Sequence, residues 1–516
     1  MKLRDYLRDL SLEGPPAASS GSLDCEVREV CDDSRAVQPG DLFVAVRGAT
    51  SDGHDHLREA MERGAVAAVV ESEAHVEGLS FPGGIVRVAS TRAALGQLAA
   101  MRYGEPARAL RLIGVTGTNG KTTTTFLIES MLQAAGRKVG VLGTVNYRWG
   151  DEPQVVRPAP YTTPGPLELH RTLAEMRTAG CTHAIMEVSS HALTQERLAG
   201  VRFRVGAFTN LTQDHLDFHG TMDAYFHAKA RLMRHLLSSP DGVGVIFMDG
   251  GYGKRMAGSV VGERLLVSLV DEGADVSPKR YRCTIDGIEA ELSSPLGAIE
   301  LRSPLVGRYN LANIVVATGV AIALGVDVSA IRKGVAELAG VPGRMERVPS
   351  SLGFSVLVDY AHSPDALENV IGTLRPLIKP DGRLLCVFGC GGDRDRAKRP
   401  QMGEVVARGA DLAIVTSDNP RTEEPRAIVD MILEGMRKAD MPLLEEAAAL
   451  GVALRGFHVE VDRRRAIQAA ITAARPDDVV LIAGKGHEDY QIIGHTKHPF
   501  DDRAVAREAL AERAPA

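Results

Sequence analysis

The sequence predicts an α/β protein of three domains, in which a central and a C-terminal domain each have a mostly parallel sheet with helices on both faces. The length of 516 residues exceeds what one hydrophobic core fills. Short apolar segments alternate with helical ones along most of the chain, which is typical of parallel strands joined by helices. The composition, with 44% hydrophobic and 24% charged residues, is that of an ordinary globular protein.

The first predicted domain covers residues 1–108. Strand-like runs at 41–46, 65–70 and 84–89 alternate there with helical segments. The first ten residues, MKLRDYLRDL, mix charges into a helical pattern and have no apolar core of the kind that a signal peptide needs. No export is indicated, and we expect a cytoplasmic protein.

The central domain is predicted at residues 109–342. A strand-turn-helix unit opens it, and apolar strands follow at 138–144, 182–188, 204–210 and 242–248. An uncharged run at 309–326 approaches the length that spans a membrane, but it contains Asn310, Asn313 and Thr318. A buried helix is therefore expected, and no membrane segment.

The C-terminal domain is predicted at residues 343–516, after a hinge with the sequence AGVPGRMERV at 339–348. Strands are expected at 354–360, 383–389, 411–417 and 478–484, enough for a second doubly wound, Rossmann-like sheet. Ligands of such sheets bind beyond the carboxyl ends of the strands.

Charge and cysteine content narrow the classes of function. The net charge of -6 and the isoelectric point near 6.2 give no basic surface for nucleic acid or an anionic membrane. The six cysteines have no CxxC pair and no zinc spacing, so reduced, packed thiols are expected. The GHDH stretch at 53–56 is interpreted as a loop, because two histidines alone seldom bind a metal.

The segment GVTGTNGKTTTTFL at 114–127 predicts a phosphate-binding loop. Its glycines allow backbone N–H groups to point at an anion, and the following helix presents its N-terminus to the same charge. Lys121 would reach the outer phosphates, and the Thr122 hydroxyl would bind Mg²⁺. The usual pattern has a glycine where this chain has Val115, so the loop is a variant, and a structural glycine turn is the alternative.

Carboxylates and histidines follow two of the central strands. Glu187 ends the strand at 182–188 and is a sensible ligand for Mg²⁺, although a glutamate at a strand end is usually just solvated. Asp214, His215 and Asp217 crowd together after the next strand. This crowding indicates a metal or phosphate site, or else a loop in which an aspartate caps a helix.

Four motifs in this order resemble the Mur ligase family, the ATP-dependent enzymes that add amino acids to the peptidoglycan precursor: GTNGKTT at 117–123, EVSSHAL at 187–193, NLTQDHLDFH at 210–219 and YNLANI at 309–314. The resemblance spans essentially the whole chain. It also includes DDSR at 32–35, GRMERV at 343–348, VDYAHSPDAL at 358–367 and GCGGDRDRAKRP at 389–400. Within the family, the chain is most similar to the enzymes that add the third residue of the stem peptide.

The resemblance implies an N-terminal UDP-binding domain, a central ATPase domain and a C-terminal domain that closes over the nucleotide. It implies that ATP phosphorylates the side-chain carboxylate of D-glutamate in UDP-MurNAc-L-Ala-D-Glu, and that an amine displaces phosphate from the acyl phosphate. ATP and Mg²⁺ are the implied cofactors. The partners are small-molecule substrates, without nucleic acid or membrane, and a monomer is expected.

The resemblance also implies the catalytic and nucleotide-binding residues. Lys121, Glu187, His215 and Lys229 are the implied catalytic residues. Thr122 and Glu187 would hold one metal ion, and Glu187 with His215 a second. Lys229 matches a lysine that the family carries as a carbamate, N6-carboxylysine, which turns it into an oxygen ligand for the metal; a solvated helix lysine is the alternative. The implied ATP contacts are Gly117, Thr118, Asn119, Gly120, Lys121, Thr122, Thr123, Asn313, Arg344 and Asp359.

Two further ligand sites follow from the resemblance. The implied contacts of the UDP precursor are Ser34, Ala49, Thr50, Ser51, Thr162, Thr163, Ser189, Gln195 and Arg197, although each alone is more often a turn former. The segment DNPR, formed by Asp418, Asn419, Pro420 and Arg421, resembles the signature of enzymes that add meso-diaminopimelate. Arg394, Gly484 and Glu488 complete that implied site.

An arginine fork suits diaminopimelate, because this amino acid has a distal carboxylate that lysine lacks. Lysine would leave Arg421 desolvated and unpaired, and such losses reject an analogue strongly. The alternatives from the sequence are a lysine-adding Mur ligase, a P-loop switch or motor that drives a partner, and a non-catalytic binding module.

Overall fold

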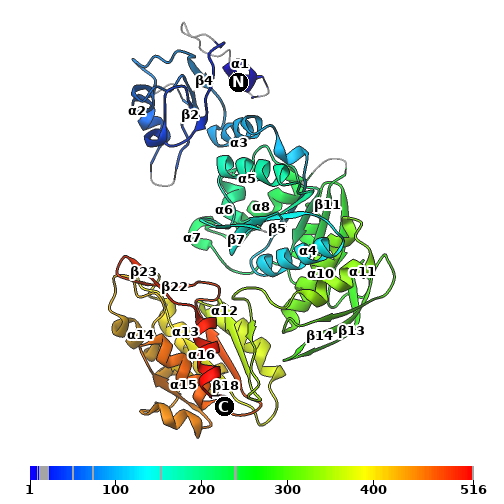
Figure 1. Ribbon diagram of the computed structural model, residues 1–516, viewed down its shortest axis with the longest axis vertical. Helices are drawn as coiled ribbons and strands as arrows, with labels where there is room; N and C mark the ends of the chain where they lie inside the picture. The colour runs from blue at the N-terminus through cyan, green and yellow to red at the C-terminus, as the bar shows by residue number, and fades with distance from the viewer. Residues whose placement is uncertain are drawn as a thin grey trace. The chain divides into compact units, whose positions relative to one another are not determined.

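The computed structural model describes residues 1–8, 10, 23–48, 51–72, 75–150, 154–237 and 241–513 (Figure 1). The chain divides into two compact units. The first consists of Met1–Ser277, Ser293–Gly297 and Asn313–Gly334, and the second of Pro278–Leu292, Ala298–Ala312 and Val335–Ala516. The predicted boundaries of three domains stay a prediction.

The N-terminal region of the first unit has a four-stranded parallel sheet in the order β1-β2-β3-β4. The three expected strands are β2 (Leu42–Val44), β3 (Ala67–Val70) and β4 (Ile85–Arg87), and β1 (Val30–Cys31) was not expected. Helices α1 (Leu3–Leu7) and α3 (Thr91–Arg102) pack against one face, and α2 (Leu57–Glu62) packs against the other. Alternate strand residues, such as Leu42 and Phe43, therefore belong to different hydrophobic cores.

The central sheet has eight strands in the order β12-β11-β10-β5-β9-β6-β7-β8. Neighbouring strands from β12 to β6 are parallel, and only β7 and β8 run antiparallel to their neighbours, so the expectation of a mostly parallel sheet is confirmed. The strands are β5 (Arg111–Thr116), β6 (Val139–Leu142), β7 (Asn146–Trp149), β8 (Val155–Pro158), β9 (His183–Glu187), β10 (Val205–Phe208), β11 (Val243–Phe247) and β12 (Glu263–Val267).

The helices that accompany the central sheet follow the α/β alternation. They are α4 (Lys121–Ala134), α5 (Pro166–Thr178), α6 (Ser190–Thr194), α7 (Leu216–His219), α8 (Met222–Arg231), α9 (Gly253–Ala257), α10 (Arg308–Ala323) and α11 (Val328–Glu337). Helix α10 coincides with the uncharged run at 309–326, and its apolar side chains are buried inside the protein, as expected. In the part of the chain that the structure describes, no helix combines the length and the apolar character that crossing a membrane requires.

The second unit contains a six-stranded sheet in the order β16-β17-β21-β18-β19-β20, parallel except for β16. One face packs against α12, α13 and α14, and the other against α15 and α16. The strands are β16 (Glu346–Val348), β17 (Ser355–Asp359), β18 (Leu384–Phe388), β19 (Leu412–Val415), β20 (Gly456–Val459) and β21 (Val479–Ala483). The helices are α12 (Pro364–Leu374), α13 (Lys398–Gly409), α14 (Pro425–Lys438), α15 (Arg463–Ala473) and α16 (Asp502–Arg513). This arrangement confirms the second doubly wound sheet.

Two antiparallel pieces were not expected from the sequence. Strands β13 (Ser277–Thr284), β14 (Gly287–Ser293) and β15 (Ile299–Ser303) form one sheet, and β22 (Tyr490–Ile493) pairs with β23 (Thr496–Pro499). These strands are half-exposed and rich in polar residues, so they lack the continuous apolar runs of the parallel strands.

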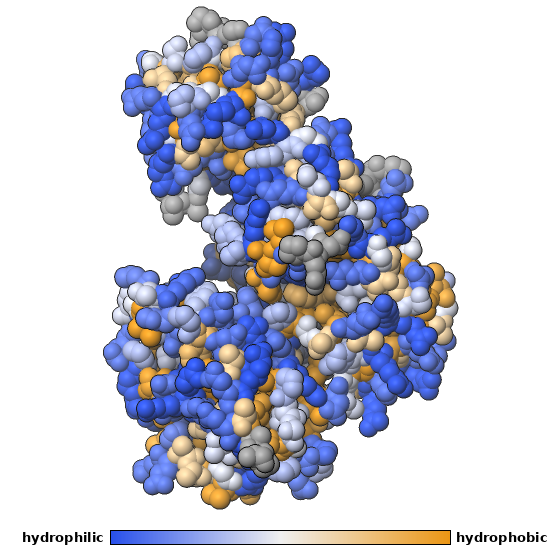
Figure 2. Space-filling view, in the orientation of Figure 1, coloured by the Kyte–Doolittle hydropathy of each residue, from blue (hydrophilic) through white to orange (hydrophobic). Residues whose placement is uncertain are grey.

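The surface agrees with the composition. Hydrophilic residues cover most of the described surface on the face shown in Figure 2. None of the six cysteines forms a disulfide in the described part of the chain.

Candidate active site

The glycine loop at 117–120 joins the end of β5 to the start of α4. Gly117 and Gly120 have φ angles of +152° and +85°. A Cβ atom on Gly117 would stand 1.9 Å from Oγ1 of Thr209, and one on Gly120 would stand 2.3 Å from Oδ1 of Asn313. The close contacts and left-handed backbone therefore require glycine at both positions. The loop is also braced from the end of β10, where Asn210 Oδ1 accepts the Asn119 N–H at 2.9 Å.

Two lysines converge on one carbonyl oxygen of this loop. Lys121 Nζ donates to Gly117 O at 3.0 Å and to Thr118 O at 2.8 Å, and Lys229 Nζ donates to Gly117 O at 2.7 Å. Lys229 lies on α8 and is only 1% exposed. Burial, together with the charge of Lys121, holds the pKa of Lys229 well below its usual value. The surroundings of Lys229 thus disfavour its ammonium form relative to a lysine in water.

Glu187, at the end of β9, is 1% exposed, and both its carboxylate oxygens accept hydrogen bonds. Its Oε2 accepts the hydroxyls of Thr122 at 3.1 Å and Thr144 at 3.0 Å, and its Oε1 accepts the Thr144 N–H at 2.9 Å. Thr144 was not predicted as a site residue. Thr144 follows β6, the strand next to β9 in the central sheet. Its position at the carboxyl end of that strand is the signal that could have identified it as a site residue.

The residues around Glu187 suit a magnesium ion. A carboxylate and a hydroxyl are hard oxygen donors, and Mg²⁺ in proteins takes its remaining ligands from water and substrate phosphates. Among the described residues, no three histidine, cysteine, aspartate or glutamate side chains converge as a protein-only metal cage. Lys229 can offer oxygen ligands to a metal only if its Nζ is carbamylated, because the carbamate group carries two oxygens.

His215 lies beside this region with its ring 45% exposed and a φ angle of +53°. Asp214 Oδ2 is 3.4 Å from His215 Nε2, and the ring packs edge-on against His191 at 4.9 Å between centroids. Burial among cationic groups lowers the pKa of His215. No aspartate side chain caps α7, because its N-cap is His215 without a side-chain hydrogen bond. The alternative of a capped loop is therefore not supported.

Five of the residues predicted to bind the UDP precursor gather next to Glu187. Thr163 Oγ1 donates to Glu187 O at 2.7 Å and accepts the Ser189 N–H at 3.0 Å. Arg197 donates from Nη1 to Thr163 O at 3.0 Å and from Nε to Gln195 Oε1 at 2.9 Å. Thr162 is the fifth member, and its Oγ1 lies 3.2 Å from Thr144 Oγ1.

The predicted precursor contacts in the N-terminal sheet are held by local partners. Ser34 Oγ donates to Glu59 Oε2 at 2.7 Å, and Ser51 Oγ lies 2.9 Å from His56 Nε2. Ala49 and Thr50 lie outside the described residues. In the GHDH stretch, His54 pairs with Asp52 at 2.6 Å and accepts the Glu71 N–H at 3.0 Å. Both its ring nitrogens are therefore occupied. The expectation of a loop at 53–56 was wrong, because Gly53–His56 form a 3-10 helix whose N-cap is Asp52.

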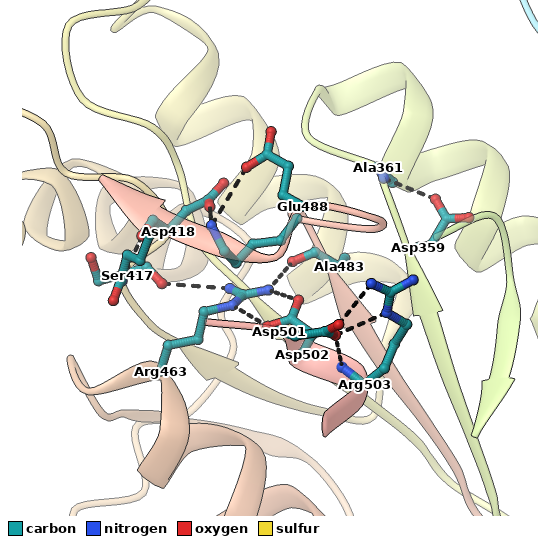
Figure 3. Close-up of polar contacts among 12 residues, drawn as sticks. Asp359, Ala361, Ser417, Asp418, Arg463, Ala483, Glu488, Asp501, Asp502 and Arg503 are labelled. Atoms are coloured by element: carbon teal, nitrogen blue, oxygen red, sulfur yellow. Dashed lines mark hydrogen bonds and ion pairs between the residues drawn. The ribbon is translucent and has the colours of Figure 1, made fainter. Parts of the chain in front are cut away.

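Asp359 ends β17 in the second unit and is buried. Its carboxylate accepts the N–H groups of Met345 and Ala361, each at 2.8 Å; Figure 3 shows the contact with Ala361. Burial raises the pKa of Asp359, and Arg344 opposes this shift. The Arg344 guanidinium stacks over the ring of Tyr360 at 5.0 Å. Asp359 fixes the hinge segment and does not cap α12, whose cap is Ser363.

A buried charged cluster contains Asp418, Asn419 and Glu488 of the predicted amino-acid site. Figure 3 shows Asp418 and Glu488 side by side above Arg463. Lys485, which the sequence did not single out, is fully buried between them, with Nζ 3.4 Å from Asp418 Oδ1 and 3.5 Å from Glu488 Oε2. Asn419 donates to Glu488 Oε2 at 2.9 Å and accepts Lys485 Nζ at 2.9 Å. The cluster therefore contains two carboxylates and one buried cation.

Arg394 and Arg421 lie on two adjoining loops beyond β18 and β19. Arg421 Nη1 donates to Gly392 O at 2.8 Å, and Arg394 Nη1 donates to the neighbouring Asp393 O at 3.0 Å. Pro420 lies in the same loop as Arg421, and its carbonyl stands 1.8 Å from the position of a Cβ on Gly392. Gly484 has a φ angle of +122° at the end of β21, beside Asp418.

These features define a class: an α/β protein with a nucleotide phosphate loop and a second polar site at the carboxyl ends of another parallel sheet. Three family descriptions match the chain in order: "Mur ligase family, catalytic domain" at residues 26–103, "Mur ligase middle domain" at 115–321 and "Mur ligase, glutamate ligase domain" at 343–486. The chain belongs to the Mur ligase family, and it is an enzyme of the ligase class.

Similar proteins cover nearly the whole chain. A UDP-N-acetylmuramoyl-L-alanyl-D-glutamate--2,6-diaminopimelate ligase of Geobacter metallireducens is 46% identical over 518 residues, 99% of each chain. The protein of the same name from Gloeobacter violaceus is 48% identical over 491 residues, 95% of each chain. A solved structure with this ligase name is 32% identical, with a TM-score of 0.70 over 99% of both chains.

Proposed function

We propose that the protein is an ATP-dependent ligase that adds meso-2,6-diaminopimelate to the side-chain carboxylate of D-glutamate in UDP-MurNAc-L-Ala-D-Glu, a step of peptidoglycan synthesis. The names of the whole-length relatives support this function. The observation that carries it is that Arg421 and Arg394 lie on adjoining loops, next to the charged cluster that contains Asn419 and Glu488. The acidic members suit an ammonium, and the guanidinium groups suit a carboxylate.

The first chemical step joins two anions, because a carboxylate oxygen must attack the terminal phosphate of ATP. Lys121 and the N–H groups of the glycine loop are the groups that stabilise the phosphates. Mg²⁺, held by Thr122 and Glu187 and, for a second ion, by Glu187, His215 and carbamylated Lys229, would offset the remaining negative charge. The bond between the β- and γ-phosphates breaks, so the products of this step are ADP and an acyl phosphate. Phosphate is a better leaving group than the oxide ion that a free carboxylate would have to lose.

The second step is attack by an amine of the incoming amino acid, with loss of phosphate. Thr162, Thr163, Ser189, Gln195 and Arg197 are proposed to orient the sugar and peptide of the precursor. Ser34, Ala49, Thr50 and Ser51 are proposed for its nucleotide end. Asn313, Arg344 and Asp359 are proposed to contact ATP, and Asp418, Pro420 and Gly484 complete the amino-acid site. We further propose that the enzyme acts as a cytoplasmic monomer.

The choice of amino acid distinguishes this proposal from a lysine-adding ligase, which the names of the relatives do not favour. Purified protein would be incubated with ATP, Mg²⁺, the UDP-dipeptide and either diaminopimelate or lysine, and the product weighed by mass spectrometry. The proposal expects product with diaminopimelate and little with lysine. Product with lysine alone would contradict it, and ATP turnover without the UDP-dipeptide would favour a switch or motor.

An arginine substitution sharpens this experiment. Arg421→Ala should lose activity with diaminopimelate by about 100-fold or more, because the distal carboxylate loses its charge-assisted partner. The KM values for ATP and the UDP-dipeptide should change little. An Arg421→Ala enzyme that uses diaminopimelate as well as the wild type does would remove the support for this assignment.

A further inference from the structure

The loops that carry Arg394 and Arg421 are joined backbone to backbone. Gly392 donates its N–H to Asn419 O at 2.9 Å, and Gly392 O accepts Arg421 Nη1 at 2.8 Å. Any side chain on Gly392 would collide with Pro420 O. The guanidinium of Arg421 is therefore set directly against the loop at 389–397 that carries Arg394.

One carboxylate, that of Glu423, ties the two loops to the body of the unit. Its Oε1 accepts the Asp393 N–H at 2.6 Å and Arg399 Nη2 at 2.8 Å, and its Oε2 accepts Arg399 Nη1 at 3.0 Å. Arg396 Nη2 lies 3.1 Å from the same Oε2. Arg399 lies on α13, is fully buried and also donates to Gly391 O at 3.3 Å. The two parallel hydrogen bonds from Arg399 fix the orientation of the Glu423 carboxylate as well as its distance from α13.

The joined loops hold two strained residues in place. Asp393 and Arg421 have φ angles of +52° and +53°, in the left-handed region that non-glycine residues seldom adopt without support. The Asp393 carboxylate accepts the hydroxyl of Thr422 at 2.8 Å and its N–H at 3.2 Å. Hydrogen bonds from Arg399 lower the pKa of Glu423 to about 2, so this carboxylate is ionised at neutral pH.

We infer that Glu423 is a positioning residue that sets the spacing between Arg394 and Arg421 and thereby selects an amino acid with a distal carboxylate. The inference rests on the proposed function. Both oxygens of Glu423 are occupied by Asp393 and Arg399, so Glu423 acts through the loops and not by touching the substrate. Small displacements of a binding group cost much affinity when two groups must engage one ligand together.

Glu423→Gln tests this inference, because it keeps the size of the side chain and removes its charge. The KM for diaminopimelate should rise about 10- to 100-fold, the range expected for loss of a charge-assisted hydrogen bond. The KM values for ATP and the UDP-dipeptide should stay within about twofold, since their proposed residues lie elsewhere. The preference for diaminopimelate over lysine, measured as a ratio of kcat/KM values, should fall.

Glu424→Gln is the matched control, because Glu424 is the exposed neighbour on the same loop and the charge change is identical. Its KM for diaminopimelate should equal that of the wild type. An unchanged KM in Glu423→Gln would overturn the inference. A lower Tm together with equal rises in the KM values for all three substrates would also overturn the inference, because this result would show a purely structural role for Glu423.

If Glu423→Gln does not fold, Glu423→Asp provides the same test, because it keeps the charge and shortens the side chain, so that one carboxylate can no longer reach both the Asp393 N–H and Arg399. A smaller rise in the KM for diaminopimelate, again without a change for ATP, would support the inference, and no rise would overturn it. A wild-type enzyme that forms no product with diaminopimelate would instead refute the proposed function, and the inference with it. Failure of the inference alone leaves the wild-type activity intact.

Discussion

At the scale of single residues, the active-site region depends on contacts between groups that lie far apart in the sequence. The two lysines that meet at Gly117 O come from α4 and α8, about 100 residues apart in sequence. Glu187 accepts hydrogen bonds from Thr122, which also lies on α4, and from Thr144, which follows β6. Each of these contacts predicts an effect of substitution that differs from simple loss of a charge.

Replacement of Lys229 by alanine tests whether this lysine acts as a carbamate. Lys229→Ala should abolish activity, and added acetate or formate should restore part of it, because a small carboxylate can supply the missing oxygen ligand. The measurement is the rate of phosphate release with and without the added anion. A variant that keeps full activity would contradict the assignment, and rescue by chloride alone would point to a nonspecific salt effect.

Thr144→Val tests the support of Glu187. The substitution removes one hydroxyl donor and keeps the backbone N–H donor at 2.9 Å. We expect kcat to fall about tenfold and the Mg²⁺ concentration for half-maximal rate to rise, as is typical when a partner of a metal ligand is lost. Thr496→Val, an exposed threonine on β23, is the control. Equal Mg²⁺ dependence in Thr144→Val and the wild type would contradict the role of Thr144.

At the scale of elements, strand β9 has the buried carboxylate of Glu187 at its end and a buried histidine at its start. His183 is 2% exposed, and burial with the charges of Arg111 and Arg137 lowers its pKa to about 4. Between pH 4 and 6.5, the unfolded chain therefore binds a proton at this residue that the folded chain does not bind. The free energy of unfolding should fall as the pH drops through this window.

His183→Gln should make the slope of stability against pH less steep, by an amount that corresponds to the uptake of up to one proton on unfolding. Denaturant unfolding at several pH values between 6.5 and 4 measures the slope of stability against pH. His498→Gln, at an exposed position on β23, should leave the slope unchanged. If the slopes of His183→Gln and the wild type coincide, His183 is not a source of the acid sensitivity.

The parallel strands were predictable because they are buried on both faces and read as continuous apolar runs. The β13–β15 sheet was not predictable, since a strand such as β13 exposes Lys279 and Arg280 and shows only a weak alternation of buried and exposed residues. In the site, Glu187 and the glycine loop were predicted from local motifs. Thr144 and Lys485 were missed, because their roles arise only when separate strand ends meet at one edge of a sheet.

At the scale of the whole molecule, the residues predicted to bind ATP belong to both compact units. Lys121 and Asn313 lie in the first unit, and Arg344 and Asp359 in the second. The three-domain boundaries and the assignments of ligand residues remain predictions, whereas the family, the fold class and the ligase class are established.

Binding of ATP is expected to stabilise the folded protein against heat. At a concentration 100 times the Kd, the gain is about 2.7 kcal/mol, which appears as a higher Tm. Lys121→Ala should lose most of this shift, because its ammonium is the proposed phosphate partner. Asp359→Asn should lose part of it if Asp359 contacts the ribose. Thermal unfolding with and without Mg-ATP measures both, and a full shift in Asp359→Asn would contradict the ribose contact.

The meeting of two lysines at one carbonyl oxygen has a practical consequence for any screen for inhibitors. An unmodified Lys229 adds no negative charge to the loop, whereas a carbamylated Lys229 would add one next to Lys121. If Lys229 is carbamylated, as proposed, dissolved carbon dioxide is a reagent that changes the charge beside the glycine loop. Compounds selected in degassed buffer would be chosen against a different target from those selected in bicarbonate.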